Sequence, residues 1–191
     1  MKPSLRYDER MDFGPLRQVL GPLYLALDPA HREEHAQYLD KTAHQLLARE
    51  CEPGSADSAL VTALSYLLVA RESVLRDVAT RSSIEAFFVE AGWTAPRIRE
   101  LFRALERLPD KPKSTEEKLV ADAETLGRLG MRGFVRLLAM HAATGTSLPD
   151  VLGQLRQAPN RRVFTRSARK DAQPLRDELR ELVKRWEQSL E

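Results

Sequence analysis

Two histidines in the first fifth of the chain have a spacing that suits metal binding. His31 and His35 are four residues apart, which places both imidazoles on one face of a helix and matches a two-histidine metal clip. The same spacing is also common in helices that bind no metal. The pair therefore predicts a metal site only if other ligands join it from elsewhere in the chain.

A single acid, Asp122, lies between small residues in a segment that otherwise resembles a helix folding onto a core. The segment is EEKLVADAETLGRLGMRGF, residues 116–134. Because an unpaired charge on a buried helix is costly, Asp122 must have a partner. Arg71, Arg81 and Arg128 are candidates for an ion pair with it.

The strongest concentration of basic residues is NRRVFTRSARK, residues 160–170, where arginines surround one phenylalanine. The arginines that could contact phosphate groups are Arg161, Arg162, Arg166 and Arg169. Such a patch suits a nucleotide or a nucleic acid. The alternative is an ordinary solvated loop, and both interpretations stay open.

The composition is typical of a soluble globular protein. Hydrophobic residues make up 42% and charged residues 30% of 191 residues, and 30 basic side chains nearly balance 28 acidic ones. The small net charge argues against a nucleic acid partner. No apolar run approaches the roughly 20 residues that cross a bilayer, and the single Cys51 fits a reducing compartment. We therefore expect a cytoplasmic protein without a membrane segment.

The elements that would position these residues are helices. Apolar residues recur at helical spacing almost throughout, and no segment shows the strict alternation of a strand. The segment SALVTALSYLLVA is apolar nearly all round, which is typical of a helix buried in the middle of a fold. After Pro174 the last segment carries a clean apolar stripe opposite its charges. The prediction is an all-α protein: about eight helices in one domain over residues 13–191, after a flexible lead-in over residues 1–12.

Three stretches, in this order, resemble the HD-domain superfamily of metal-dependent phosphohydrolases in its small, stand-alone bacterial form. DPAHREEHAQYL is similar to the family's "DPAHDxxHVxRV", and ADAETLGRLGMRGFVR to its "DADKLDALGAIG(I)AR". FTRSARKDAQPLRDELRELVKRW is similar to the closing "F.T..gR.lAeeR..fl..fl..l". The resemblance covers nearly the whole chain and implies an HD-like helical bundle. It also implies that His35 takes the place of the first metal ligand and Asp122 that of the last.

The chain departs from the family at the residues that define the metal site. Where relatives have a string such as "AALLHDIG", this chain has TALSYLLV, so that Ser65 and Tyr66 replace the signature His–Asp pair. Leu108 stands where relatives often have another histidine. On this alignment His35, Ser65, Tyr66 and Asp122 line what remains of the site. Two hydroxyl groups would keep such a pocket polar, although a tyrosine with a satisfied hydroxyl is also common in a core.

These losses predict a pseudoenzyme that holds no metal. A hydrolytic site needs at least three protein ligands and an open position for water, and one imidazole with one carboxylate does not supply them. We therefore expect a non-catalytic binding or regulatory protein. A protein partner or self-association is its leading role, and a small phosphorylated ligand is the second.

The alternative is a divergent metal-dependent phosphohydrolase. It would bind Mn, Fe, Ni or Zn through His31, His35 and Asp122 and act on a nucleotide or another phosphate ester. Asp122 as a working ligand and Asp122 as a buried, hydrogen-bonded remnant both stay open at this stage.

Overall fold

The computed structural model describes residues 11–28 and 32–189, and the regular secondary structure of this part of the chain is entirely helical. The helices are α1 (Gly14–Ala26), α2 (Glu33–Glu50), α3 (Ser58–Val69), α4 (Arg71–Arg76), α5 (Val78–Glu90), α6 (Ala95–Arg107), α7 (Thr115–Gly127), α8 (Gly130–Thr144), α9 (Leu148–Gln157), the short 3-10 helix η2 (Ala158–Asn160) and α10 (Arg166–Gln188). No strand occurs among the described residues. The predicted all-α fold is confirmed, whereas nearly all of the predicted lead-in over residues 1–12 lies outside the described residues.

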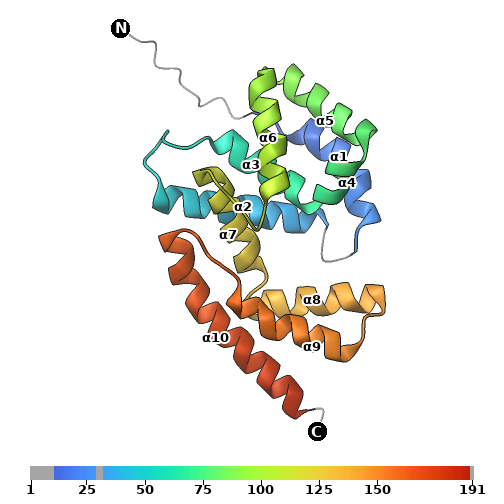
Figure 1. Ribbon diagram of the computed structural model, residues 1–191, viewed down its shortest axis with the longest axis vertical. Helices are drawn as coiled ribbons and strands as arrows, with labels where there is room; N and C mark the ends of the chain where they lie inside the picture. The colour runs from blue at the N-terminus through green and yellow to red at the C-terminus, as the bar shows by residue number, and fades with distance from the viewer. Residues whose placement is uncertain (1–10, 29–31, 190–191) are drawn as a thin grey trace.

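Helices α2, α3 and α7 form the centre of the molecule. α2 packs most extensively against α3 and α7, and α3 also contacts α7. Leu39 of α2, Leu64 of α3 and Leu119 of α7 are fully buried there. In Figure 1, α1, α5 and α6 lie above this centre and α8, α9 and α10 lie below it. Because α8 follows α7 directly, α7 connects the central helices to the lower group.

The most deeply buried helix is α7. Its first turn is fixed by a capping box, in which Ser114 Oγ accepts a hydrogen bond from the Glu117 amide and the Glu117 carboxylate accepts one from the Ser114 amide. Arg107 also donates two hydrogen bonds to the Glu117 carboxylate, at 2.6 and 3.0 Å. Every residue over 119–127 is buried. Any acid in this stretch therefore needs partners within the protein.

A glycine allows α2 to approach α7 closely. A Cβ atom on Gly127 would lie 2.9 Å from Tyr38 Cε1 and 3.4 Å from His35 Cε1. Only a residue without a side chain therefore fits here without moving Tyr38 or His35. This approach brings the imidazole of His35 within reach of the acids on α7.

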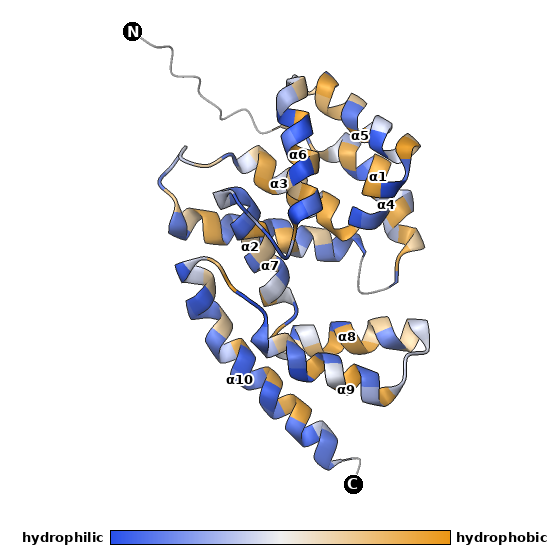
Figure 2. Ribbon diagram, viewed as in Figure 1, coloured by the Kyte–Doolittle hydropathy of each residue, from blue (hydrophilic) through white to orange (hydrophobic). Residues whose placement is uncertain are grey.

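The last helix, α10, lies along the lower half of the molecule with a mostly hydrophilic visible face (Figure 2). Leu179 and Val183 of the predicted apolar stripe are buried, and Trp186 packs edge-on against Phe134 of α8 at 5.5 Å. The helix begins at Arg166 and includes Pro174, so it starts earlier than the sequence pattern alone suggested. Among residues 11–28 and 32–189, no helix is both long enough and apolar enough to cross a bilayer.

Candidate functional site

The candidate site is built around His35 of α2 and Glu124 of α7. Both residues are buried, with 4% and 5% of their surface exposed. His35 Nε2 lies 2.7 Å from Glu124 Oε2. Because an ionised carboxylate can only accept, Nε2 carries the proton and donates to Glu124.

Two arginines contact the same carboxylate. Arg128 Nε donates to Glu124 Oε1 at 2.6 Å, and the Arg136 guanidinium lies 3.4 Å from the same oxygen. Burial alone would raise the pKa of Glu124, but the hydrogen bond from His35 and the charges of Arg136 and Arg128 outweigh it. The pKa of Glu124 is therefore held well below its usual range, and the group is a buried anion clamped by cations.

A cavity of about 290 Å³ opens beside this cluster, and we call it the His35 cavity. His35, Glu124, Arg128 and Arg136 form one polar part of its lining. The part of α3 that reaches it ends in Leu68 and Val69. Leu68 and Val69 are apolar, and Arg71, Glu72 and Ser73 at the start of α4 then add polar side chains to the lining.

Ser65 and Tyr66 lie elsewhere on α3. Ser65 Oγ donates to the Val61 carbonyl one turn earlier in the same helix, and the Tyr66 carbonyl accepts a hydrogen bond from the Tyr24 hydroxyl at 2.8 Å. Neither residue is among the described residues that line the His35 cavity. The sequence-based grouping therefore differs from the observed one, since α3 is apolar on nearly all sides and its sequence does not fix which residues face α2 and α7.

Asp122 is fully buried on the other side of α7 from Glu124. Its carboxylate accepts three hydrogen bonds: from the Phe164 amide at 2.7 Å, the Thr165 amide at 2.8 Å and Thr165 Oγ1 at 2.7 Å. Burial raises the pKa of Asp122, and these three donors only partly offset that effect. The carboxylate of Asp122 is thus buried and hydrogen-bonded, and its donors come from residues 164–165 and not from an arginine.

The arginines proposed from the sequence as partners of Asp122 bind other groups. Arg71 donates to the carbonyls of Leu105 and Glu106, and Arg81 pairs with Glu85. Arg128 belongs to the Glu124 cluster. His31 lies outside the described residues, so the predicted His31–His35 pair has no structural description. Within the described residues, no three His, Cys, Asp or Glu side chains come together as a metal-binding group.

A second cavity, of about 520 Å³, adjoins the first, and we call it the arginine pocket. It lies between α8, α9 and the segment over residues 158–164. Arg128, Arg136 and Pro109 line both cavities. The Glu124 cluster is therefore one wall of a larger basic site.

The four arginines predicted to contact phosphate divide into two pairs. Arg161 and Arg162 line the arginine pocket. Arg166 and Arg169 lie in the first turn of α10, and the Arg169 guanidinium donates to the carbonyls of Thr165 and Phe164 at 3.1 and 3.2 Å. The structure thus brings only the first pair together with Arg128 and Arg136.

Comparison with known proteins gives a clear result only for the three-dimensional structure. No protein-family model matches the sequence, and no curated protein matches it either. The structure of Bacillus subtilis YpgQ in complex with ADP is similar, with a TM-score of 0.70 and 17% sequence identity over 90% of this chain and 96% of that chain. The Lin1889 protein of Listeria innocua is similar with a TM-score of 0.69 and 13% identity, over 91% of this chain and 93% of that one.

A third similar structure carries the name of the superfamily. It is a predicted HD superfamily hydrolase from an uncultured Thermotogales bacterium, with a TM-score of 0.60 and 20% identity over 96% of this chain and 97% of that chain. This chain has an HD-domain-like fold. The fold that the three sequence motifs implied is thereby confirmed.

Within this HD-like fold, sequence reasoning missed Glu124 and Arg136. Glu124 aligns with the second acid of the family string "DADKLDALGAIG(I)AR", and Arg136 aligns with its closing arginine. Asp122 and Glu124 are two residues apart, so they point to opposite sides of α7, and only one of them can face His35. Which of Asp122 and Glu124 faces His35 depends on how α7 is rotated about its axis relative to α2. A linear motif does not contain that information.

Proposed function

We propose that this HD-like protein is a cytoplasmic pseudoenzyme that binds a phosphorylated small molecule without hydrolysing it. The observation that carries the proposal is the pair of guanidinium groups on the carboxylate that faces His35, at 2.6 Å for Arg128 and 3.4 Å for Arg136. In this proposal the arginines supply the positive charge that a metal ion supplies in a hydrolase.

The donor set does not fit a catalytic metal. His35 and Glu124 offer one nitrogen and one carboxylate, and the other carboxylate of the lining, Glu72, is largely exposed and pairs with Arg76. A catalytic centre of this kind needs three protein ligands and an open position for water. A divalent cation would also lie beside the Arg128 guanidinium, and two like charges at that range repel each other strongly in a partly buried site.

The enzyme alternative is supported less well. It needs Asp122 as a ligand, yet both oxygens of Asp122 accept hydrogen bonds from residues 164–165. It also relies on His31, which lies outside the described residues. The proposed function therefore includes no reaction step by His31, His35 and Asp122.

A phosphorylated ligand suits the charge of the site. Arginine forms paired, charge-assisted hydrogen bonds with phosphate oxygens, and a partly buried cluster of arginines strengthens them. The similar structure of YpgQ is in complex with ADP, which supports a ligand of this class without fixing its identity. A single protein partner at this place is less well supported, because the arginines line concave cavities rather than a flat surface.

A thermal-shift series tests this proposal. The purified protein would be melted with MnCl2, ZnCl2, ADP, ribose 5-phosphate or inorganic pyrophosphate, and its metal content would be measured. We expect a higher melting temperature with at least one phosphorylated compound, no rise with either metal, and no release of phosphate. An Arg128→Gln variant should lose the response to phosphate, whereas Arg180→Gln, on the exposed surface of α10, should keep it.

Two results would overturn the proposal. One is a metal bound at one equivalent and lost in His35→Ala, together with metal-dependent hydrolysis of a phosphate ester. The other is the absence of any response to all three phosphorylated compounds.

A further inference from the structure

The arginine pocket has the size of a small-molecule site. Its volume of about 520 Å³ lies within the roughly 300–1,000 Å³ range of ligand pockets. It lies on the far side of Arg128 and Arg136 from the His35 cavity, against α8 and α9. Part of its lining, including Thr125 and Phe164, belongs to the stretches that resemble the HD motifs, whereas Leu137, Met140 and the residues of α9 do not.

The charges that line this pocket are strongly unbalanced. Four arginines line it, namely Arg128, Arg136, Arg161 and Arg162, against one carboxylate, Asp110. Although Arg161 is exposed, the surrounding protein and the nearby charge of Arg128 lower the pKa of its guanidinium. Burial and neighbouring arginines likewise lower the pKa of Arg136. Crowded guanidinium groups of this kind are stabilised by an anion that lies between them.

Another part of the lining is apolar. Leu137 and Met140 of α8 and Leu155 of α9 form an apolar surface there. Side-chain amides border this surface at Gln154, Gln157 and Asn160. A ligand that fills the whole pocket therefore needs an anionic end, an apolar body and polar groups at its edge.

We infer that the arginine pocket binds a phosphate ester of nucleotide size, with its phosphates on Arg128, Arg136 and Arg161 and its organic group against Leu137 and Met140. This inference rests on the proposed function and assigns it to a site beside the His35 cavity rather than within it. The amides of Gln154 and Gln157 would contact polar groups of the organic part.

The shared wall gives this site a second property. Arg128 and Arg136 now contact Glu124, and a bound phosphate competes with Glu124 for the same guanidinium groups. Occupation of the arginine pocket should therefore change the surroundings of the His35–Glu124 pair without direct contact. The ring resonances of His35 in an NMR spectrum report this change.

Calorimetric titration with two probes, ADP and inorganic pyrophosphate, tests the assignment. Pyrophosphate has the anionic end only, so we expect it to bind more weakly than ADP. Arg161→Gln should weaken both probes by about 10- to 100-fold, since it removes charge-assisted hydrogen bonds. Met140→Ala should weaken ADP by roughly 3- to 10-fold and leave pyrophosphate unchanged, because it removes apolar contact only.

Two matched controls separate the pocket from general effects of charge and size. Arg180→Gln removes the same charge from the exposed face of α10, and Met131→Ala removes the same side chain from an exposed position on α8. Both controls should bind ADP as the unsubstituted protein does. Titrated ADP should also shift the His35 ring resonances.

The outcomes distinguish this inference from the proposed function. If ADP binds but Arg161→Gln and Met140→Ala bind it unchanged, or if pyrophosphate binds as tightly as ADP, the pocket assignment is overturned and the proposed function stands. If no phosphorylated compound binds the unsubstituted protein, both are overturned.

Discussion

Asp122 and Glu124 lie two residues apart on α7 and have opposite electrostatic surroundings. Burial by itself would raise the pKa of both carboxyl groups. Around Glu124 the His35 hydrogen bond and the full charges of Arg136 and Arg128 reverse that effect, so its pKa falls well below the usual range. Around Asp122 the partners are neutral donors, which compensate less than charges do, and the pKa stays raised. Glu124 is consequently the acid that balances the arginines.

Glu124→Gln should destabilise the protein by about 3 kcal/mol at neutral pH, because it leaves the buried Arg136 without its counter-charge. The folded-state pKa of Glu124 lies below the usual 4.5, so its stabilising contribution is present above that pH and is lost as the pH falls through the folded value. The difference in unfolding free energy between the unsubstituted protein and Glu124→Gln should therefore become smaller as the pH falls below 4.5. Urea unfolding across this pH range measures it.

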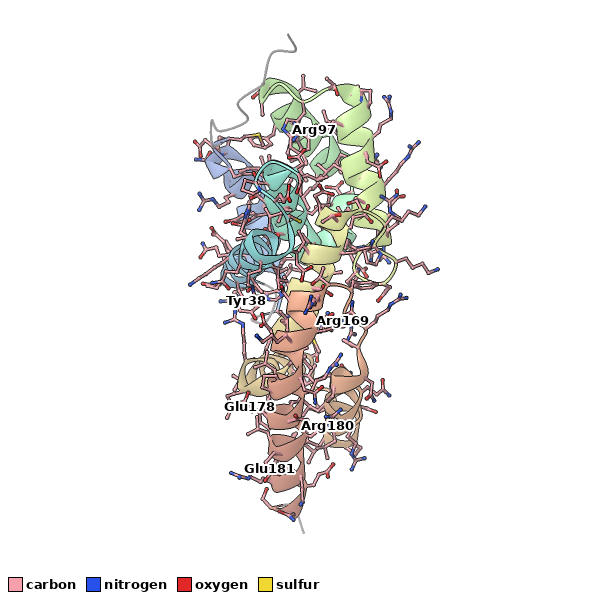
Figure 3. The ribbon with its side chains drawn as sticks, turned by 90° about the vertical axis from the view of Figure 1, so that its left-hand side faces the viewer. Tyr38, Arg97, Arg169, Glu178, Arg180 and Glu181 are labelled. Carbon is pink, nitrogen blue, oxygen red and sulfur yellow. The ribbon has the colours of Figure 1, made fainter. Side chains whose placement is uncertain are left out.

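The control for this experiment is Glu181→Gln, which removes an exposed surface pair with Arg185 on α10 (Figure 3). It should change stability by less than about 1 kcal/mol. A stability gap for Glu124→Gln that stays constant with pH would mean that Glu124 is not ionised in the folded protein.

At the level of single residues, the sequence was enough to single out His35 and to predict that Asp122 is buried, but it did not predict that Glu124 faces His35. A motif fixes spacing along the chain, whereas the partner of His35 depends on the rotation of α7 about its axis. The same limit applies to Ser65 and Tyr66, since α3 has no polar face from which its rotation could be inferred. The rotation of α7 and α3 about their axes depends on their packing against α2, and a short sequence motif carries no information about that packing.

At the scale of the helices, glycine positions decide how α2 and α7 fit together. Gly127 ends α7 where the rings of Tyr38 and His35 press against it, and a Cβ there would lie 2.9 Å from Tyr38 Cε1. Gly153, in the middle of α9, has no atom within 4 Å of the position where its Cβ would lie. The two glycines therefore have different effects. Gly127 permits the close contact between α2 and α7, whereas Gly153 only adds to the backbone entropy that is lost on folding.

This difference predicts opposite effects of the same substitution. Gly127→Ala should destabilise the protein by roughly 1–3 kcal/mol, since it overpacks the contact between α2 and α7. Gly153→Ala should stabilise it by up to about 1 kcal/mol, because alanine loses less entropy in a helix. Urea unfolding of both variants is the measurement. A stabilising Gly127→Ala would show that α2 lies further from α7 than described here.

Helix periodicity was enough to predict the all-α class and the apolar face of the last helix, because each pattern spans several turns. It did not separate the six-residue α4 from α3, since one and a half turns are too short to show a period. The apolar periodicity also predicted that the last helix begins near Pro174, whereas α10 begins at Arg166 and continues through that proline. The additional contacts of its first turns with α2 and α7 compensate for the missing donor.

At the scale of the whole molecule, the large exposed apolar side chains of the described residues are spread over several helices. Leu25, Val78, Val89 and Leu148 are on three different helices, and Met131 and Val135 lie about one turn apart on α8. Scattered residues of this kind are normal for a monomer. A protein partner or self-association therefore remains a proposal with less structural support than a small ligand.

α10 joins the lower group of helices to the centre through polar contacts. Glu178 accepts a hydrogen bond from the Met131 amide at the start of α8 (Figure 3), and Asp171 pairs with Arg49 of α2. At its N-terminus, Thr165 caps the helix and also donates to Asp122 of α7. The Asp122 contact is the buried one, so it should contribute most to the position of the segment that lines the arginine pocket.

Asp122→Asn tests this arrangement. An asparagine has one acceptor oxygen for three donors, and its amide would face an N–H group, so we expect a loss of about 1–3 kcal/mol. The backbone amides of Phe164 and Thr165 should exchange hydrogen faster, while amides in the middle of α3 keep their protection. Asp171→Asn, which breaks only a surface pair, should cost less than about 1 kcal/mol and leave those two amides unchanged. Equal exchange in both variants would show that α10 and the wall of the arginine pocket hold their place without the hydrogen bonds to Asp122.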